Sequence, residues 1–513
     1  MRDLASVLAS SARWDADKAA LVFRGRSISY GRLDGVASQT AGALAGAGLE
    51  KGDRLALLAG NVPEFVYGLY GAWRAGVVAV PLNVMLTPPE LSAILADCGA
   101  RAIVCEMGYV PNVLEIRDAL PQLETIFVVA GPPVPHGTTS FEEALGKAAD
   151  PPEVEMTADD LALVQYTSGT TAAPRGAMLT HGNLLANLEQ TQEVPALKQS
   201  EDDVVLLVLP LFHIYGLNAG LNLTIRVGAT GVLVERFDAI GAADVIREQG
   251  ATIVPGAPPM YHSWLEEGGV PDEAFSTVRL AVSGAAPLPA DTLEAFRDRF
   301  GVTIWEGYGL TETSPSLTTT AVGGEAKPWS IGLPLPGVDV RIVDPDGTDV
   351  ENGDPGEILV RGPNVFRGYW DRPDETGEAF ADGWFRTGDV AYRDEDGYLF
   401  LVDRSKDLVI VSGFNVYPKE VEDALLAHPE IEQVAVVGVP DPHTGEAVKA
   451  FVVLMPGSAL TPEDIVEHAT RSLARFKVPR EIEVAEELPL QATGKVLRRA
   501  LRGEKPGGGE PEA

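Results

Sequence analysis

Short apolar runs alternate with helix-like segments from the start of the chain to about residue 400. The runs "DRLALLAG", "ARAIVC", "DVVLLVL" and "ATIVPG" have the length and composition of buried strands. Several runs of this kind end in Gly, Ser or Asn, and open sheets usually bind ligands at the ends of their strands. Regular alternation of strands and helices predicts an α/β architecture with largely parallel sheets.

The pattern changes in the last third of the chain. Between "VRIVDPDGTDV" and "GYLFLVDR", short strands are separated by Asp-Gly turns, which predicts a small antiparallel subdomain. After "DRSKD", the strand "LVIVSG", the helix "YPKEVEDALLAH" and strands at 433–439 and in "EIEVAEELP" predict an α+β unit of about one hundred residues. We therefore expect an N-terminal domain over 1–402, a hinge at 403–407, a C-terminal domain over 408–502 and a disordered tail over 503–513.

Composition narrows the classes of function. A formal net charge of −34 argues against nucleic-acid binding, because a phosphate backbone needs a basic surface. The two cysteines, Cys98 and Cys105, cannot form a disulfide framework and match no zinc signature, so a reducing, cytoplasmic setting fits best. The N-terminus has the pattern of neither a signal peptide nor a transit peptide. The longest uncharged run contains Pro210 and His213, which favours a buried strand, a loop and a helix over a membrane span.

The stretch "YTSGTTAAPRGAMLTH" concentrates hydroxyls and unhindered backbone amides in one place. It lies between a strand-like run, "LALVQ", and "MLTHGNLLANL", whose apolar spacing suits a helix. Backbone N–H groups and Ser or Thr hydroxyls can surround phosphate oxygens in such a loop, and Arg175 adds positive charge. Taken alone, the stretch fits a plain surface loop equally well.

Four further stretches carry side chains that are common in active sites: "YGLTET", "RTGDV", "DRSKDLVIVSGFNVYP" and "LPLQATGKVLRR". Each has an ordinary explanation by itself, since Glu312 suits a helix start, Asp389 suits a turn and Lys495 suits a solvated surface. Their joint occurrence, in this order along one chain, requires a functional explanation.

Together with "TSGTTAAPRG", these stretches resemble the core motifs of the adenylate-forming superfamily of acyl-CoA synthetases, peptide-synthetase adenylation domains and beetle-type luciferases. The resemblance extends from about Leu21 to Arg499. It implies a large N-terminal domain, a mobile C-terminal domain and a two-step reaction. A carboxylate and ATP give acyl-AMP and pyrophosphate, and a thiol then takes the acyl group. ATP, Mg²⁺ and coenzyme A are the cofactors that this reaction implies.

The resemblance also assigns roles to residues of the nucleotide site. Glu312 is the expected Mg²⁺ ligand, because carboxylate oxygens suit hard cations, and Thr311 is expected to donate to the α-phosphate. The expected β- and γ-phosphate ligands are Thr167, Ser168, Gly169, Thr170, Thr171 and Arg175. The other expected nucleotide contacts are Gly284, Ala285 and Ala286 at the adenine, Tyr308 stacked on it with Gly309 alongside, and Asp389 and Arg404 at the ribose.

The remaining implied roles fall in the C-terminal part of the chain. Lys495 is expected to bridge the substrate carboxylate and the phosphate during adenylation. Lys406 is expected to be the hinge between the domains, because it lies in "DRSKD", where the sequence pattern restarts. Gly413 and Phe414, in "VSGFNVYP", are expected to border the pantetheine tunnel.

The phosphate loop departs from the family pattern at two positions. The family usually has Gly where this chain has Ala172, and Lys where it has Arg175. Arginine keeps the charge and adds a planar fork, so the pyrophosphate contacts should survive. Alanine disfavours positive φ, which leaves the shape of the loop open. The loop lacks the G-x-x-x-x-G-K-[ST] spacing of a Walker motif.

Three functions are compatible with this resemblance: an acyl-CoA synthetase, an adenylation enzyme that loads a carrier protein, and a non-enzymatic protein that retains the fold. The intact set of Glu312, Asp389, Lys406 and Lys495 argues against the third. The stretch "PLFHIYGLN" has His213, a candidate catalytic residue or a core histidine, and no acid where amino-acid-activating relatives have Asp. A buried ammonium group without a partner is unstable, so an acyl-CoA synthetase is favoured.

The segments expected to line the acyl pocket are "FHIYGLN", "PGAPPMY", "SGAAP" and "TSPS", and none contains Asp, Glu, Lys or Arg. Each methylene buried in such a pocket contributes about 0.8 kcal/mol, so we expect a fatty or arylaliphatic monocarboxylic acid as substrate. Arg226 or Arg236, just outside these segments, could swing inward and accept a dicarboxylate. The expected partners are this acid and CoA, without nucleic acid or a transmembrane segment, and the sequence is compatible with a homodimer.

Overall fold

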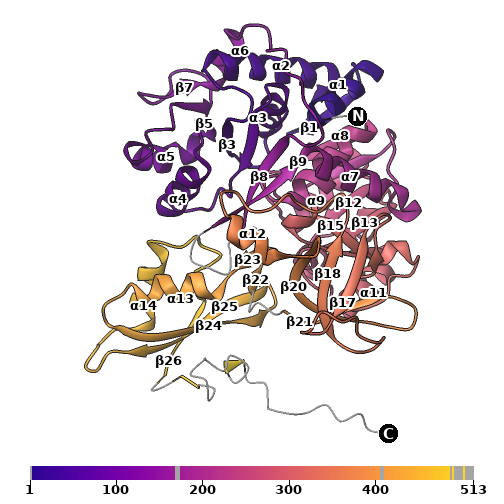
Figure 1. The fold of residues 1–513 in the computed structure, drawn as a ribbon. Helices are drawn as coiled ribbons and strands as arrows, with labels where there is room; N and C mark the ends of the chain where they lie inside the picture. Colours follow the sequence, from indigo (N-terminus) through magenta and orange to yellow (C-terminus); the bar gives the residue numbers. More distant parts are fainter. Residues whose placement is uncertain (1–2, 168–173, 405–408, 486–487, 490–500, 503–513) are drawn as a thin grey trace. The chain divides into compact units, whose positions relative to one another are not determined.

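A computed structural model describes residues 3–167, 174–404, 409–485, 488–489 and 501–502 (Figure 1). The described residues form two compact units, the first within 1–84, 94–167 and 175–403, and the second within 85–93 and 404–513 together with Pro174. The predicted α/β class, with an antiparallel subdomain and a C-terminal α+β unit, is confirmed. Most of the expected hinge and the expected tail lie outside the described residues, and the predicted domain boundaries remain predictions.

The first unit contains a seven-stranded sheet with the order β7-β6-β5-β3-β4-β8-β9. Its strands are β3 (Arg54–Leu58), β4 (Val78–Pro81), β5 (Ala102–Glu106), β6 (Thr125–Val129), β7 (Thr139–Ser140), β8 (Leu161–Thr167) and β9 (Arg175–Thr180). All neighbours pair in parallel except β8 and β9, which are antiparallel. The helices along this part of the chain are α2 (Tyr30–Gly46), α3 (Pro63–Arg74), α4 (Pro88–Cys98), α5 (Val110–Ile116) and α6 (Phe141–Gly146).

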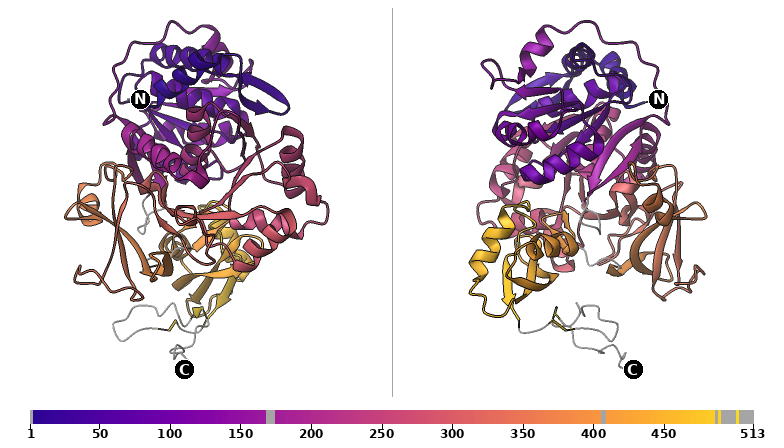
Figure 2. Two further views of the ribbon diagram at one scale, coloured as in Figure 1. Left: turned by 90° about the vertical axis from the view of Figure 1, so that its right-hand side faces the viewer. Right: turned by 60° about the vertical axis from the view of Figure 1, so that its left-hand side comes forward.

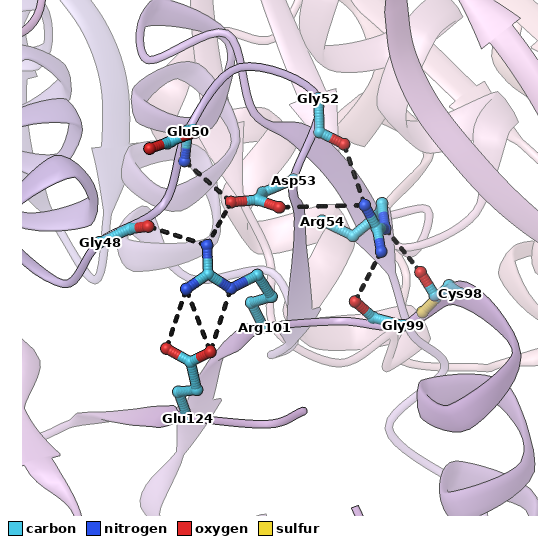
Figure 3. A network of polar contacts seen from close by, with 9 residues as sticks. All are labelled: Gly48, Glu50, Gly52, Asp53, Arg54, Cys98, Gly99, Arg101 and Glu124. Carbon is cyan, nitrogen blue, oxygen red and sulfur yellow. Dashed lines mark hydrogen bonds and ion pairs between the residues drawn. The ribbon is translucent and has the colours of Figure 1, made fainter. Parts of the chain in front are cut away.

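Charged side chains fix the N-terminal ends of β3 and β5, as Figure 3 shows. Arg101 lies between Asp53 and Glu124, with nitrogen–oxygen distances of 2.7 and 2.9 Å. Arg54 donates to the carbonyl oxygens of Cys98 (2.6 Å) and Gly99 (2.9 Å) at the end of α4. The Arg54 guanidinium thereby satisfies the carbonyl group of Cys98, which the helix end leaves without an intrahelical partner.

Both cysteines are buried and free, as expected for a chain without a disulfide framework. Burial raises the pKa of the Cys98 thiol to about 11 and that of Cys105 to about 12. Since the thiolate is the reactive form, neither cysteine suits a nucleophilic role.

The first unit also contains a nine-stranded sheet, with the order β16-β15-β14-β13-β12-β10-β11-β1-β2. Its strands are β1 (Ala19–Phe23), β2 (Arg26–Ser29), β10 (Val204–Leu207), β11 (Thr230–Leu233), β12 (Ile253–Gly256), β13 (Leu280–Ser283), β14 (Ile304–Gly309), β15 (Ser316–Thr319) and β16 (Leu333–Pro334). The run from β1 to β14 is parallel, and β2, β15 and β16 pair antiparallel at its edges. The carboxyl ends of the parallel strands therefore meet at one edge, the usual place for a ligand.

Helices accompany this sheet: α1 (Leu4–Trp14), α7 (His181–Glu193), α8 (Leu223–Val227), α9 (Ala239–Gln249), α10 (Pro258–Glu266) and α11 (Ala290–Phe300). Helix α10 packs against both α9 and α11, and Figure 2 shows this group of helices from two further sides. Their shared core is aromatic: Phe296 contacts Tyr261 and Phe275 with ring centroids 5.2 and 5.0 Å apart, both edge to face. Such pairs stabilise a core beyond the area that they bury.

The antiparallel subdomain predicted from the Asp-Gly turns is a five-stranded sheet, β17-β18-β20-β19, with β21 paired to β20. Its strands are β17 (Asp339–Val343), β18 (Gly356–Arg361), β19 (Phe380–Ala381), β20 (Trp384–Arg393) and β21 (Leu399–Arg404). The segment between β18 and β19 contains a short helix, α12 (Pro373–Ala379).

The second unit has a five-stranded sheet, β23-β22-β25-β24, with β26 parallel to β25. Its elements are β22 (Val409–Val411), β23 (Phe414–Val416), α13 (Pro418–Leu426), β24 (Ile431–Asp441), β25 (Gly445–Leu454), α14 (Pro462–Thr470) and β26 (Glu481–Val484). Apolar faces of α13 and α14 join the sheet in one core around Val421, Leu425 and Ile465, all fully buried. Glu422 also reaches this core, and its Oε1 accepts a hydrogen bond of 2.9 Å from the backbone N–H of Val436.

The long uncharged run folds as predicted, as a strand, a loop and a helix. It comprises β10, a loop, a π-helix at Tyr215–Asn222 and α8. Within the described ranges, no helix has both the length and the apolar composition needed to cross a membrane.

Candidate active site

The candidate phosphate loop connects two antiparallel strands. Thr167 ends β8 and pairs with Arg175, the first residue of β9, so the two ends of the loop lie side by side. Ser168, Gly169, Thr170, Thr171 and Ala172 lie outside the described residues, and their phosphate-binding roles remain predictions.

The prediction of a helix beginning at Met178 was wrong. Residues 175–180 form β9, in which Met178 pairs with Val164 and Leu179 with Leu163, and α7 begins only at His181. Thr180 caps the helix, because its hydroxyl accepts from the backbone N–H of Asn183. The loop is thus part of a hairpin rather than a strand–loop–helix unit.

Arg175 is held at the start of β9 by two neighbours. Its Nε lies 2.5 Å from Glu375 Oε2, and its guanidinium carbon lies 5.5 Å from the centre of the Tyr369 ring. The side chain is only 17% exposed. This environment keeps the charge of Arg175 beside the loop and limits the orientations that its guanidinium can take.

The predicted metal ligand Glu312 lies in a short 3₁₀ turn, Thr311–Thr313, directly after β14. Its side chain is 9% exposed, and its Oε1 accepts a hydrogen bond of 2.8 Å from the Tyr369 hydroxyl. Thr311 next to it is half-buried. Gly309 is required here, because a Cβ atom at this position would lie 1.8 Å from the carbonyl oxygen of Pro315.

Three buried amides that sequence reasoning missed hold this turn in place. Asn218 donates to the carbonyl oxygen of Ser314 (2.7 Å), and Asn364 donates to that of Thr313 (2.9 Å). Asn187 both donates to and accepts from the backbone of Ser316. For Asn187 and Asn218, the sequence signal was Asn within an apolar helical segment, where a buried amide requires partners, whereas Asn364 lies in a turn after β18.

Tyr308 and Asp389 are brought together from distant parts of the chain. The Tyr308 hydroxyl donates to Asp389 Oδ2 over 2.6 Å, and both residues are half-buried. Asp389 lies in β20, which places the predicted ribose ligand beside the predicted adenine-stacking ring. The backbone of Arg404 is described as the end of β21, and its predicted ribose contact remains a prediction.

The predicted adenine loop, Gly284 to Ala286, follows the carboxyl end of β13. Ala285 has φ +70°, and a Cβ at Gly284 would lie 3.1 Å from the ring of Tyr215. The hydroxyl of Tyr215 donates to the carbonyl oxygen of Val282 over 3.1 Å. Ser283 Oγ is buried and makes no hydrogen bond within the described part of the chain. The Ser283 hydroxyl is therefore available to form a hydrogen bond with a ligand bound at this loop.

His213 lies between β10 and the π-helix, where its Nδ1 accepts a hydrogen bond of 3.3 Å from the backbone N–H of Tyr215. Desolvation lowers the pKa of His213 to about 4, so the imidazole is neutral at neutral pH. Arg226 lies in α8, before the amino end of β11, and its Nη2 donates to Glu189 over 2.9 Å. Arg236 is exposed after β11.

In the second unit, Gly413 has φ +83° and forms the turn between β22 and β23. Phe414 begins β23 and packs against Phe476 with ring centroids 4.9 Å apart. Lys406 and Lys495 lie outside the described residues. The predicted roles of all four residues remain predictions.

Comparison with known proteins agrees with these motifs. Residues 8–370 match the family described as AMP-binding enzyme, and residues 420–495 match the AMP-binding enzyme C-terminal domain. A long-chain-fatty-acid–CoA ligase of Yersinia pestis is 38% identical, over 96% of this chain and 92% of that protein. A feruloyl-CoA synthase of an Amycolatopsis species is 37% identical, over 96% of each chain.

A solved structure of o-succinylbenzoate CoA synthetase from Bacillus subtilis superposes with a TM-score of 0.87 at 30% identity, covering 98% of this chain and 99% of that one. Sequence and fold therefore agree over nearly the full length. The resemblance in the motifs is confirmed, and the chain belongs to the AMP-binding enzyme family.

Proposed function

We propose that this chain is an AMP-forming acyl-CoA synthetase, which uses ATP to activate a monocarboxylic acid with an uncharged acyl tail and transfers the acyl group to CoA. The observation that carries the proposal is the polar cluster at the carboxyl end of β14, where Glu312 is buried against Tyr369 and Tyr308 donates to Asp389. Membership of the AMP-binding enzyme family supports the two-step reaction.

The chain's residues supply distinct parts of the adenylation step. The substrate carboxylate attacks the α-phosphate, so negative charge builds up there and must be stabilised by cations and hydrogen-bond donors. Thr311 is half-buried next to Glu312 and offers a hydroxyl to the α-phosphate, while Arg175 offers charge to the departing pyrophosphate. In this proposal, Lys495 contacts the substrate carboxylate during adenylation. Lys406 is the hinge about which the domains move between the two half-reactions.

Glu312 fits the role of a Mg²⁺ ligand. Its Oε1 accepts from Tyr369, and its Oε2 accepts no hydrogen bond from any other described residue. In nucleotide sites, Mg²⁺ is held by one or two carboxylates together with phosphates and water, so one buried carboxylate suffices. This agrees with the described residues, among which no three His, Cys, Asp or Glu side chains cluster as a metal site. When bound, the ion neutralises phosphate charge.

The surroundings of the expected acyl pocket support an uncharged acid. Burial lowers the pKa of His213 to about 4 and keeps its ring neutral, so it supplies no fixed charge. Arg226 lies before the amino end of β11, whereas ligands of such sheets bind at the carboxyl ends of the strands. Its guanidinium also pairs with Glu189. The relatives named for long-chain fatty acids and for feruloyl-CoA fit this substrate class.

The test is pyrophosphate release by the purified full-length protein with octanoate, palmitate, ferulate, malonate and phenylalanine, each with and without CoA. We expect release with one or more of the first three acids, and acyl-CoA only when CoA is added. A clear preference for malonate or phenylalanine would overturn the substrate assignment. Acid-dependent pyrophosphate release with no thioester in the presence of CoA would overturn CoA as the acceptor.

A further inference from the structure

We propose that Tyr369 is a positioning residue that orients two groups of the nucleotide site at once, the Arg175 guanidinium through its ring and the Glu312 carboxylate through its hydroxyl. This inference rests on the proposed function, since it concerns how that site holds its nucleotide. Tyr369 lies almost 200 residues from Arg175, and no sequence motif connects the two.

Backbone hydrogen bonds place Tyr369 between these two groups. The segment 366–370 runs antiparallel to β9, where Ala177 and Tyr369 form a bridge. Three hydrogen bonds flank this bridge: Met178 N–H to Gly368 O (2.9 Å), Arg367 N–H to Met178 O (3.0 Å) and Trp370 N–H to Gly176 O (2.7 Å). At the other end of the segment, the Phe366 N–H donates to the carbonyl oxygen of Glu312 over 2.8 Å. The segment therefore connects the strand after the phosphate loop to the turn that carries Glu312.

The Tyr369 side chain repeats this connection. Residues 175 and 177 lie on the same face of β9, so the side chain of Arg175 is diagonal to that of Tyr369 across the pair of strands. The guanidinium carbon lies 5.5 Å from the ring centre, within the range of a cation–π contact. The hydroxyl at the far end of the same ring donates to Glu312 Oε1 over 2.8 Å.

A hydrogen bond to Oε1 restrains the Glu312 side chain and leaves Oε2 for another ligand. Tyr369 is only 6% exposed, and its ring also packs edge to face on Phe366 with centroids 4.9 Å apart. A tyrosine packed in this way has little rotational freedom. Its hydroxyl therefore holds the carboxylate in one orientation before the nucleotide binds, which reduces the entropy lost on binding.

A chain of ion pairs restrains Arg175 from its other side. Glu375 approaches Arg175 Nε at 2.5 Å and lies 3.6 Å from Arg372, which in turn pairs with Asp97 at 2.6 Å. Asp97 also accepts from the hydroxyl of Tyr166 on β8 over 2.5 Å. Nε thus lies in an ion pair with Glu375 without forming a hydrogen bond to it, and no nitrogen of the Arg175 guanidinium makes a hydrogen bond within the described part of the chain. A guanidinium held through Nε presents its two terminal nitrogens as a fork for an anion.

The ring and the hydroxyl make separable contributions, which gives a direct test. Tyr369→Phe keeps the ring under Arg175 and removes the bond to Glu312, whereas Tyr369→Leu removes both contacts. Glu375→Gln weakens the ion pair with Arg175 and leaves Tyr369 intact. Tyr30→Phe is the matched control, since the buried Tyr30 hydroxyl donates over 2.6 Å to the carbonyl oxygen of Ala229, just before β11 in the other sheet.

Binding of a non-hydrolysable ATP analogue to the full-length variants would be measured by calorimetry with and without Mg²⁺. We expect Tyr369→Phe to weaken Mg²⁺-dependent binding about tenfold, the usual effect of losing a hydrogen bond to a charged group, and to leave Mg²⁺-free binding unchanged. Glu375→Gln should weaken binding in both conditions, and Tyr369→Leu should show both defects. Tyr30→Phe should bind like the wild type.

Two results would overturn the inference: a Tyr369→Phe protein that binds the analogue with wild-type Mg²⁺ dependence, or one that loses Mg²⁺-free binding to the same extent. If Tyr369→Phe does not fold, which circular dichroism would show, Glu375→Gln is the deciding variant. Unchanged Mg²⁺-free binding of the analogue by Glu375→Gln would refute the proposal that Arg175 presents its terminal nitrogens to an anion. A wild-type protein that binds the analogue but releases no pyrophosphate with any acid contradicts the proposed function instead.

Discussion

Glu306 provides a test of the electrostatics around the candidate site. It lies in β14, two residues before Tyr308, and is 6% exposed. Its Oε1 accepts one hydrogen bond of 3.2 Å, from the backbone N–H of Leu288 beyond the adenine loop. Desolvation raises the pKa of Glu306 from 4.5 to about 8, and the hydrogen bond offsets only part of that effect. The carboxyl group is therefore largely protonated at neutral pH.

The sign of the resulting pH dependence follows from linkage. The folded protein holds the Glu306 proton up to about pH 8, whereas the unfolded chain releases it near pH 4.5. Folding then becomes less favourable as pH rises through this window, because the folded state must either keep the proton or bury a charge. Each pKa unit corresponds to about 1.4 kcal/mol, so the whole window is worth roughly 5 kcal/mol of unfolding free energy.

Glu306→Gln keeps the shape and the acceptor of the side chain and removes its ionisation. We expect the variant to lose much less unfolding free energy between pH 5 and pH 9 than the wild type does, measured from urea denaturation midpoints at several pH values. Asp298→Asn is the control, because the Asp298 side chain is 74% exposed. The same chemical change there should leave the dependence of unfolding free energy on pH as in the wild type. Identical slopes for wild type and Glu306→Gln would refute the reasoning.

Three further perturbations test other parts of the molecule. Asn218→Ala removes the donor to Ser314 O, so we expect a loss of about 1–3 kcal/mol in unfolding free energy and slower adenylation; unchanged kinetics would separate that amide from the site. Phe296→Ala empties the centre of the aromatic core and should cost about 3–5 kcal/mol by urea denaturation, and a loss below about 1 kcal/mol would contradict the packing. Lys495→Ala should abolish acyl-AMP formation yet largely spare thioester formation from preformed acyl-AMP, and equal loss of both half-reactions would refute its assigned role.

The parallel parts of the first unit's sheets were predictable because strands such as β3, β5 and β10 are almost entirely apolar. A run such as "LALL" in β3 is buried on both faces of a parallel sheet, so length and composition identify it without periodicity. The candidate site residues were predictable for another reason. Tyr308, Glu312 and Asp389 lie within short motifs whose order along the chain resembles that of a known superfamily, and the comparisons confirm this family.

The error at Met178 has a physical cause. The stretch "GAMLTHGNLLANL" has apolar residues at spacings that a helix and a strand both accommodate, and local propensity does not distinguish them. Tertiary contacts decide the outcome, because Met178 pairs with β8 on one side and its backbone bonds to residues 367 and 368 on the other. The cap at Thr180 then determines where the helix starts, a signal that was present in the sequence but weaker than the apolar spacing.

Contacts between distant segments explain the departure from the family pattern at Arg175. A lysine has a single ammonium group, so an ion pair with Glu375 and a contact to a phosphate would have to share one charged nitrogen. Arginine divides these tasks, because Nε lies in the ion pair with Glu375 while the two terminal nitrogens remain for an anion. Its guanidinium also contacts the Tyr369 ring, and arginine makes such cation–π contacts more often than lysine does. The substitution at residue 175 is therefore best understood together with Tyr369 and Glu375, two residues that no local motif connects to the loop.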